Sequence, residues 1–123
     1  MAPLNARVLD NGLTVLDTEA NRVDICSSEP TTYAAATSTL TLGNETSISI
    51  SAPADASPNG RKVTLSAITG ASVTGTGTAT HYAISDTSNS RLLATGSLSA
   101  SQVVTSGNTF SLTASDIRIP DPA

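Results

Sequence analysis

From residue 22 onward, apolar side chains alternate with Ser and Thr, and this pattern limits the choice of fold more than any other feature of the chain. The alternation is clearest at residues 80–85 and 110–113. A repeat of two residues is typical of a β-strand with one face buried. Gly, Pro and Asn turn signals recur about every ten residues between such segments. The pattern predicts an all-β protein, an antiparallel sandwich or barrel of about seven to nine short strands.

The expected elements follow from this repeat and from the turn residues. A helical turn is expected at 31–36, a turn at Gly43–Asn44, and a surface loop at 52–60, which contains two prolines. Strands are expected at 22–27, 39–42, 47–51, 63–68, around Val73, at 80–85, around 92–98 and at 110–113, with short apolar segments at 103–104 and 117–119. Pro30 ends the first strand, because proline cannot donate to a β-ladder.

The first 20 residues have a different repeat. Apolar side chains recur there at helical spacing, at Leu4, Val8, Leu9, Leu13, Leu16 and Ala20. Asn5 is suited to cap the start of a helix over 4–20. Gly12 weakens that helix, so a break near Asn11–Gly12 is one alternative and an extended arm is another. The sequence thus predicts an N-terminal helix or arm over 1–21, followed by a β-sandwich domain over 22–123.

Composition excludes several classes of function. The chain has 123 residues, enough for one domain, with a net charge of −4 that gives no electrostatic reason to bind nucleic acid or an anionic membrane. We see no apolar run long enough to span a membrane and no signal peptide. Aromatic residues make up only 2% of the chain, which predicts a thin core of Val, Ile, Leu and Ala. The single cysteine, Cys26, is expected to be a small buried apolar residue.

No pattern predicts a catalytic residue, a metal site or a cofactor site. His81 and Ser85 lie about 13 Å apart on an extended strand, too far for a nucleophile and its base, even with Asp86 beside them. One His and one Cys do not make a zinc site. Asn44–Thr46 matches a glycosylation pattern, but we interpret it as a polar turn. We therefore expect a non-enzymatic protein, and we expect that replacing His81 by Ala leaves its function intact.

The remaining candidate for function is the protein surface. The apolar face of the helix exceeds what the strands need for a core, so we expect it to carry part of an attachment or oligomer surface. The candidate interaction residues are Leu4, Val8, Leu9, Leu13 and Leu16 on the helix and Ile119 near the other end of the chain. A thin core also leaves stability to be gained by association, and we expect a homo-oligomer, with a trimer favoured.

Two stretches, 5–36 and 79–123, resemble small proteins from the structural gene modules of tailed phages and prophages. The second stretch carries the resemblance best, with a strand THYAISD, then RLLATGSL, then GNTFSLTASDIRI. The resemblance implies a virion component, and a capsid decoration (cement) protein fits best. Its partner would then be the major capsid protein, and its location the capsid surface, after assembly in the host cytoplasm. The competing interpretation is a tail or fibre accessory protein, which would bind a receptor or a glycan.

Overall fold

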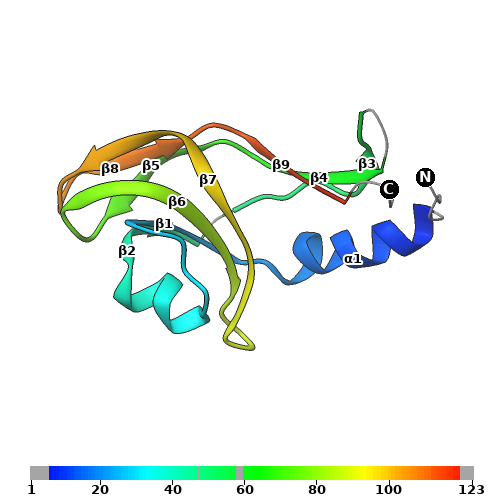
Figure 1. Ribbon diagram of the computed structural model, residues 1–123, viewed down its shortest axis with the longest axis horizontal. Coiled ribbons are helices and arrows are strands. Elements are labelled where there is room, and N and C mark those ends of the chain that lie inside the picture. The colour runs from blue at the N-terminus through cyan, green and yellow to red at the C-terminus, as the bar shows by residue number, and fades with distance from the viewer. Residues whose placement is uncertain (1–5, 47, 58–59, 120–123) are drawn as a thin grey trace. The chain divides into compact units, whose positions relative to one another are not determined.

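The chain is built mainly of antiparallel β-strands with a short helix near its N-terminus (Figure 1). The computed structural model describes residues 6–46, 48–57 and 60–119, and the side chains of 6–11 and 99 are outside that description. The predicted all-β class with an N-terminal helix is confirmed. Among the described residues the elements are α1 (Ala6–Glu19), β1 (Arg22–Cys26), the π-helical turn η1 (Ala35–Thr39), β2 (Thr41–Glu45), β3 (Ala54–Asp55), β4 (Arg61–Leu65), β5 (Ile68–Val73), β6 (Gly77–Asp86), β7 (Arg91–Val104), β8 (Thr109–Leu112) and β9 (Ser115–Ile119).

Packing divides the chain into two compact units, each made of separate stretches of sequence. Unit 1 comprises residues 1–19, 49–67 and 113–123, and unit 2 comprises residues 20–48 and 68–112. This grouping differs from the predicted arm at 1–21 and domain at 22–123. The helix belongs to unit 1, where it packs on strands that occur much later in the sequence.

Unit 1 is a three-stranded sheet, β3-β4-β9, with α1 packed against β4. Val63 and Leu65 alternate with polar residues along β4, and both are buried. Leu13 and Leu16, one helical turn apart on α1, are buried as well. The helical repeat and the strand repeat therefore meet in one small core. On the other face of the sheet, Lys62 of the central strand β4 pairs with Asp116 of β9.

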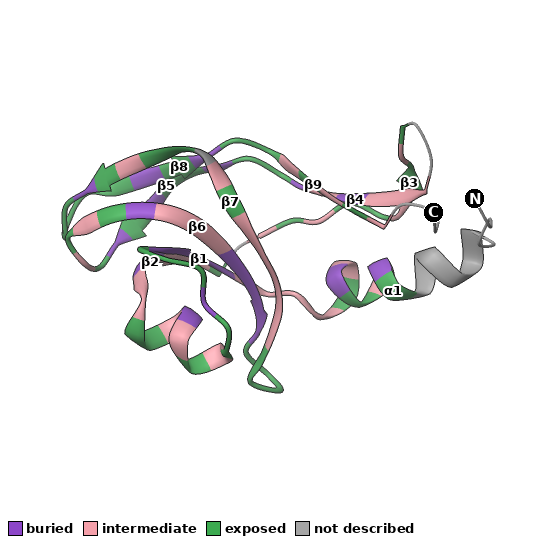
Figure 2. Ribbon diagram, viewed as in Figure 1, coloured by how far each residue is buried: buried purple, intermediate pink, exposed green. Residues whose placement is uncertain are grey.

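Unit 2 is a six-stranded sheet in the order β7-β6-β1-β2-β5-β8. Its two edge strands, β7 and β8, follow one another in the chain and are joined only by residues 105–108. A connection this short brings the two edges together at one end, so the sheet must curl. Gln102 of β7 donates to the backbone oxygen of Ser111 of β8 across this gap (3.5 Å). Figure 2 shows buried residues along β6, β1 and β5 of this sheet.

Strand β1 lies in the middle of the sheet and is buried on both of its faces. Val23 and Ile25 point to one face, as the alternation predicts. Asp24 and Cys26 point to the other, where η1 and residues 27–40 cover the sheet. Cys26 packs there with Ala36 and Ala83, so the expectation of a small buried cysteine is confirmed.

Gly43–Asn44 does not form the predicted turn but lies inside β2, paired with Ile25 and Asp24 of β1. The glycine is needed for close packing instead. A Cβ atom on Gly43 would lie 2.6 Å from the backbone oxygen of Ser72 and 3.0 Å from the Phe110 ring. Sequence reasoning assigned the glycine to a turn because a packing requirement of this kind leaves no local signal.

Other differences concern where elements begin and end. The expected strand at 47–51 is reduced to an isolated bridge between Ile50 and Leu65, with residue 47 outside the described residues. The expected strand at 63–68 is interrupted at 66–67, between β4 of unit 1 and β5 of unit 2. The helical turn runs over 33–39 rather than 31–36. The two segments expected around 92–98 and at 103–104 form one strand, β7.

We predict that Gly43→Ala lowers the free energy of unfolding by about 1–3 kcal/mol, because the added methyl group overpacks the contact with Ser72 and Phe110. Gly75→Ala is the matched control, since its Cβ would be at an ordinary distance of 3.5 Å from the nearest atom. Urea unfolding followed by circular dichroism measures both. Equal stabilities of the two variants would contradict this account of Gly43.

Candidate interaction surface

The 14-residue strand β7 is an edge strand with one neighbour, β6, in the described sheet. An edge strand exposes backbone N–H and C=O groups that can pair with another chain. Natural proteins usually protect such edges with charged residues or proline. Residues 92–104 of β7 contain neither. Val103 is 83% exposed, an unusual value for an apolar side chain in this structure. The edge of β7 therefore lacks the charged residues and prolines that usually block pairing with another strand.

Two bulges divide β7 into shorter segments. Residues 98–101 lie opposite Thr80 alone, between the pairs Ala79–Gln102 and His81–Ser97. Leu93 is a second extra residue, between the pairs Ile84–Ala94 and Ser85–Leu92. Bulges bend a strand and re-aim its side chains. Regular pairing between them is confined to residues 94–97, so this four-residue segment is the part of the edge best shaped to accept another strand.

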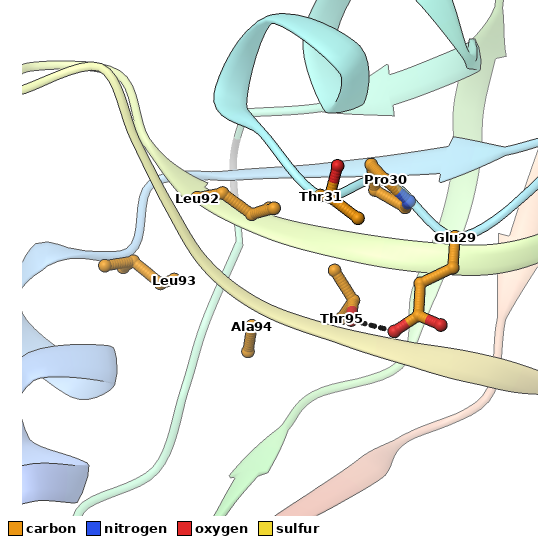
Figure 3. A pocket seen from close by; sticks show the side chains of 7 residues that line it. All are labelled: Glu29, Pro30, Thr31, Leu92, Leu93, Ala94 and Thr95. Carbon is orange, nitrogen blue, oxygen red and sulfur yellow. Dashed lines mark hydrogen bonds between the residues drawn. The ribbon is translucent and has the colours of Figure 1, made fainter.

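A cavity of about 440 Å³ lies beside this segment, between the loop at residues 29–31 and residues 92–95 of β7 (Figure 3). In a regular strand, successive side chains point to opposite faces. The bulge at Leu93 interrupts this alternation, and Figure 3 shows Leu92 and Thr95 on the side of β7 that faces residues 29–31, with Leu93 and Ala94 pointing away. Pro30 is buried and holds the loop in place, and Leu92 packs on the core cluster of Cys26, Ala36 and Ala83. The cavity is wide open to solvent and lies wholly within unit 2.

Glu29 is the charged residue among those that line this cavity. Its carboxylate accepts a hydrogen bond from the Thr95 hydroxyl at 3.1 Å, and this bond links the loop to the strand (Figure 3). The side chain is otherwise exposed, and no cation from the described residues pairs with it. The remaining lining residues are neutral. The site therefore combines a lining of mixed polarity, one negative charge and an adjacent strand edge.

The predicted interaction residues are in a different place, in unit 1 and outside this cavity. Leu4 is outside the described residues, and Val8 and Leu9 lie on α1 with side chains that are not described. Leu13 and Leu16 are buried where α1 packs on β4, so a partner could reach them only if the helix left that strand. Ile119 is half-buried on β9, and its Cδ1 atom would lie 3.4 Å from a Cβ atom on Gly12. Leu13 and Leu16 thus belong to the core beneath α1, and Ile119 lies against the same helix at Gly12. Their attachment role stays a prediction.

His81 lies far from Ser85 along its strand but directly opposite Ser97 of β7. Its Nε2 atom is 3.4 Å from the Ser97 hydroxyl, and its Nδ1 atom is 2.9 Å from the Thr80 hydroxyl. Thr80 itself donates to the backbone oxygen of Ser27. In a catalytic triad the third group is a carboxylate that stabilises the imidazolium, whereas the group beside His81 Nδ1 is the neutral hydroxyl of Thr80. Sequence reasoning missed Ser97 because the bulge at 98–101 sets the pairing of β7 with β6.

The other polar groups of unit 2 serve the structure. The Arg22 guanidinium pairs with the carboxylate of Asp24 at 2.7 Å, and this hydrogen bond raises the pKa of Arg22. The Ser85 hydroxyl is buried with no hydrogen-bond partner among the described residues. No group of three or more His, Cys, Asp or Glu in the described ranges could hold a metal ion.

We predict that Cys26 does not react with iodoacetamide while the protein is folded. The thiol is buried and donates to the backbone oxygen of Ala36, and burial followed by the charge of Asp24 raises its pKa to about 12. The reactive thiolate is then scarce at neutral pH. Mass spectrometry should show alkylation only in urea. Rapid labelling of the folded protein would contradict the described packing of η1 on β1.

We also predict a loss of stability in acid that depends on Asp86. The carboxylate accepts hydrogen bonds from the Asn89 side chain and the Ser88 backbone, which lower its pKa, with a further contribution from Arg91. A lowered folded-state pKa stabilises the fold above the ordinary value of 3.8, and this stabilisation is lost as pH falls through the folded-state pKa.

The stability of the wild type should therefore fall as the pH drops below about 4. Asp86→Asn should be less stable at pH 7, and its difference from the wild type should shrink as the pH falls through the folded-state pKa of Asp86. Urea unfolding midpoints at several pH values measure this. Parallel curves for the two proteins would show that Asp86 makes no contribution.

Comparisons with known proteins give no relative. No protein-family model matches the chain, and no curated protein or solved structure matches it either. In the described part of the chain, no helix is long and apolar enough to cross a membrane.

Proposed function

We propose that this protein is a non-enzymatic structural component of a virion that binds across adjacent subunits of a phage capsid and stabilises the shell. The observation that carries the proposal is the edge of β7, which has one neighbour and no charged residue over 92–104. Such an edge supports binding of a partner through backbone hydrogen bonds. The resemblance of residues 79–123 to phage virion proteins covers the same strand.

A protein that binds only the assembled shell stabilises it by mass action. At a free concentration one hundred times its Kd, each occupied site stabilises the shell by about 2.7 kcal/mol. The segment of β7 available for regular pairing is short, so a single contact is expected to be modest. Association of several copies on the shell would raise the overall affinity, and a homotrimer would supply this avidity.

The second candidate function is a tail or fibre accessory protein that binds a glycan. Carbohydrate sites commonly stack sugars on exposed aromatic rings. Phe110 is 3% exposed, and the half-buried Tyr82 ring lies so close to Gly96 that a Cβ atom there would be 2.5 Å from it. These two rings are used in packing, which favours a protein partner over a glycan.

We predict that the protein sediments with shells reassembled from the major capsid protein of the genome that encodes it, and does not bind unassembled subunits. Ser97→Lys should weaken shell binding at least tenfold, because it places a charge on the exposed pairing segment of β7. Thr69→Lys is the matched control, since Thr69 is an exposed residue in the bulge of β5, an inner strand of the same sheet.

Two results would contradict the proposal. If the protein fails to sediment with the shells, the partner is wrong. If Ser97→Lys and Thr69→Lys bind equally well, the edge of β7 is not the interface. Circular dichroism of both variants would show that the fold is retained.

A further inference from the structure

We infer that the cavity between residues 29–31 and 92–95 receives an Arg or Lys side chain from the extended partner segment that pairs with β7. The inference rests on the proposed function, because it names the chemistry of the partner at the same edge. In strand addition, backbone hydrogen bonds supply affinity and pockets for alternate side chains supply specificity. This cavity lies directly beside the segment at 94–97 that is available for pairing.

The walls of the cavity fit the stem of a basic side chain. The half-buried Leu92 provides apolar surface on one side, and Lys and Arg bury their methylene groups on such surface while the charged end stays near water. A purely apolar side chain would also fit these walls. It would leave the carboxylate of Glu29 without a cation at the rim.

The charge of the site selects the cation. Glu29 has one carboxylate oxygen bound to Thr95, and its other oxygen has no hydrogen bond among the described residues. Arg22, which lies in the same unit, is already paired with Asp24. An incoming cation would therefore meet an acidic group that no described basic residue neutralises. The planar guanidinium of Arg matches a carboxylate better than an ammonium does, so Arg is the preferred residue.

Thr95 positions the carboxylate for this role. Its hydroxyl donates to Glu29 from β7, so the carboxylate lies beside the segment that would pair with the partner. Thr95 is also within the segment at 94–97 that would pair with the partner. The same residue therefore couples strand pairing to recognition of the basic side chain.

The test uses n-butylguanidinium as a probe of the side chain alone, added to the full-length protein and followed by NMR. Saturable shifts are expected at residues 29–31 and 92–95, with a millimolar Kd for a ligand of this size. Neutral n-butanol should bind less well. Glu29→Gln should weaken probe binding about two- to fivefold, as for a solvent-exposed ion pair. Glu45→Gln removes the same charge elsewhere in unit 2 and should leave binding unchanged.

The following results would overturn the inference. Absent shifts, or equal binding by the wild type and Glu29→Gln, would show that the cavity does not select a cation. If raising the protein concentration alone shifts the same resonances, the occupant is a second copy of the chain. Shell sedimentation separates this from the proposed function: binding that is lost in Ser97→Lys but retained in Glu29→Gln would leave the edge interface valid and reject only the basic side chain.

Discussion

The six-stranded sheet depends on how β1 buries the carboxylate of Asp24. This residue is fully buried in the central strand, and removing its charge from water costs several kcal/mol unless it is well paired. Arg22 of β1 supplies two hydrogen bonds, at 2.7 and 2.9 Å, and the Thr41 hydroxyl of β2 supplies a third at 2.7 Å. Arg22 also reaches the backbone oxygen of Thr37 in η1. These hydrogen bonds to the Asp24 carboxylate and from Arg22 thus tie β1, β2 and η1 together. Thr41 pairs with Cys26 just after the register shift between Ile25 and Cys26, so the same bonds also hold this irregular part of the β1–β2 ladder.

The sequence was sufficient where local chemistry decides the structure. Alternation located β1, β6 and β8, and the helical repeat located α1. It failed where a residue serves a distant contact. Gly43 has the local chemistry of a turn but is required beneath Phe110, and the bulges of β7 depend on its pairing with β6. The candidate site was missed for the same reason: Glu29 and Leu92 are far apart in the sequence, and no periodic pattern connects them. Leu13 and Leu16 of the predicted apolar face are buried, but the strand that covers them could not be deduced from spacing.

The surface of unit 2 offers hydrogen bonds and a shaped cavity more than apolar area. Apart from Val103, the exposed face of β7 consists of small residues and polar residues, and its bulges shorten the regular edge. A long, flat and apolar edge would associate with any similar strand, whereas a short neutral segment beside an acidic cavity discriminates. The two bulges therefore shorten the regular part of the edge, and one of them lies beside the cavity that we propose makes binding selective.

The division of the chain into interleaved units has a consequence for synthesis on the ribosome. Leu65 of β4 pairs with Ser115 of β9, which is made about 50 residues later. At roughly 5–20 residues per second, β4 emerges several seconds before its partner. During that interval Val63 and Leu65 are covered on one side at most, by α1, and their strand has an open edge. Unit 2 is complete by residue 112, so it has the opportunity to fold while unit 1 still awaits its third strand. The order of emergence alone thus makes the small unit the more vulnerable to aggregation in the newly made protein.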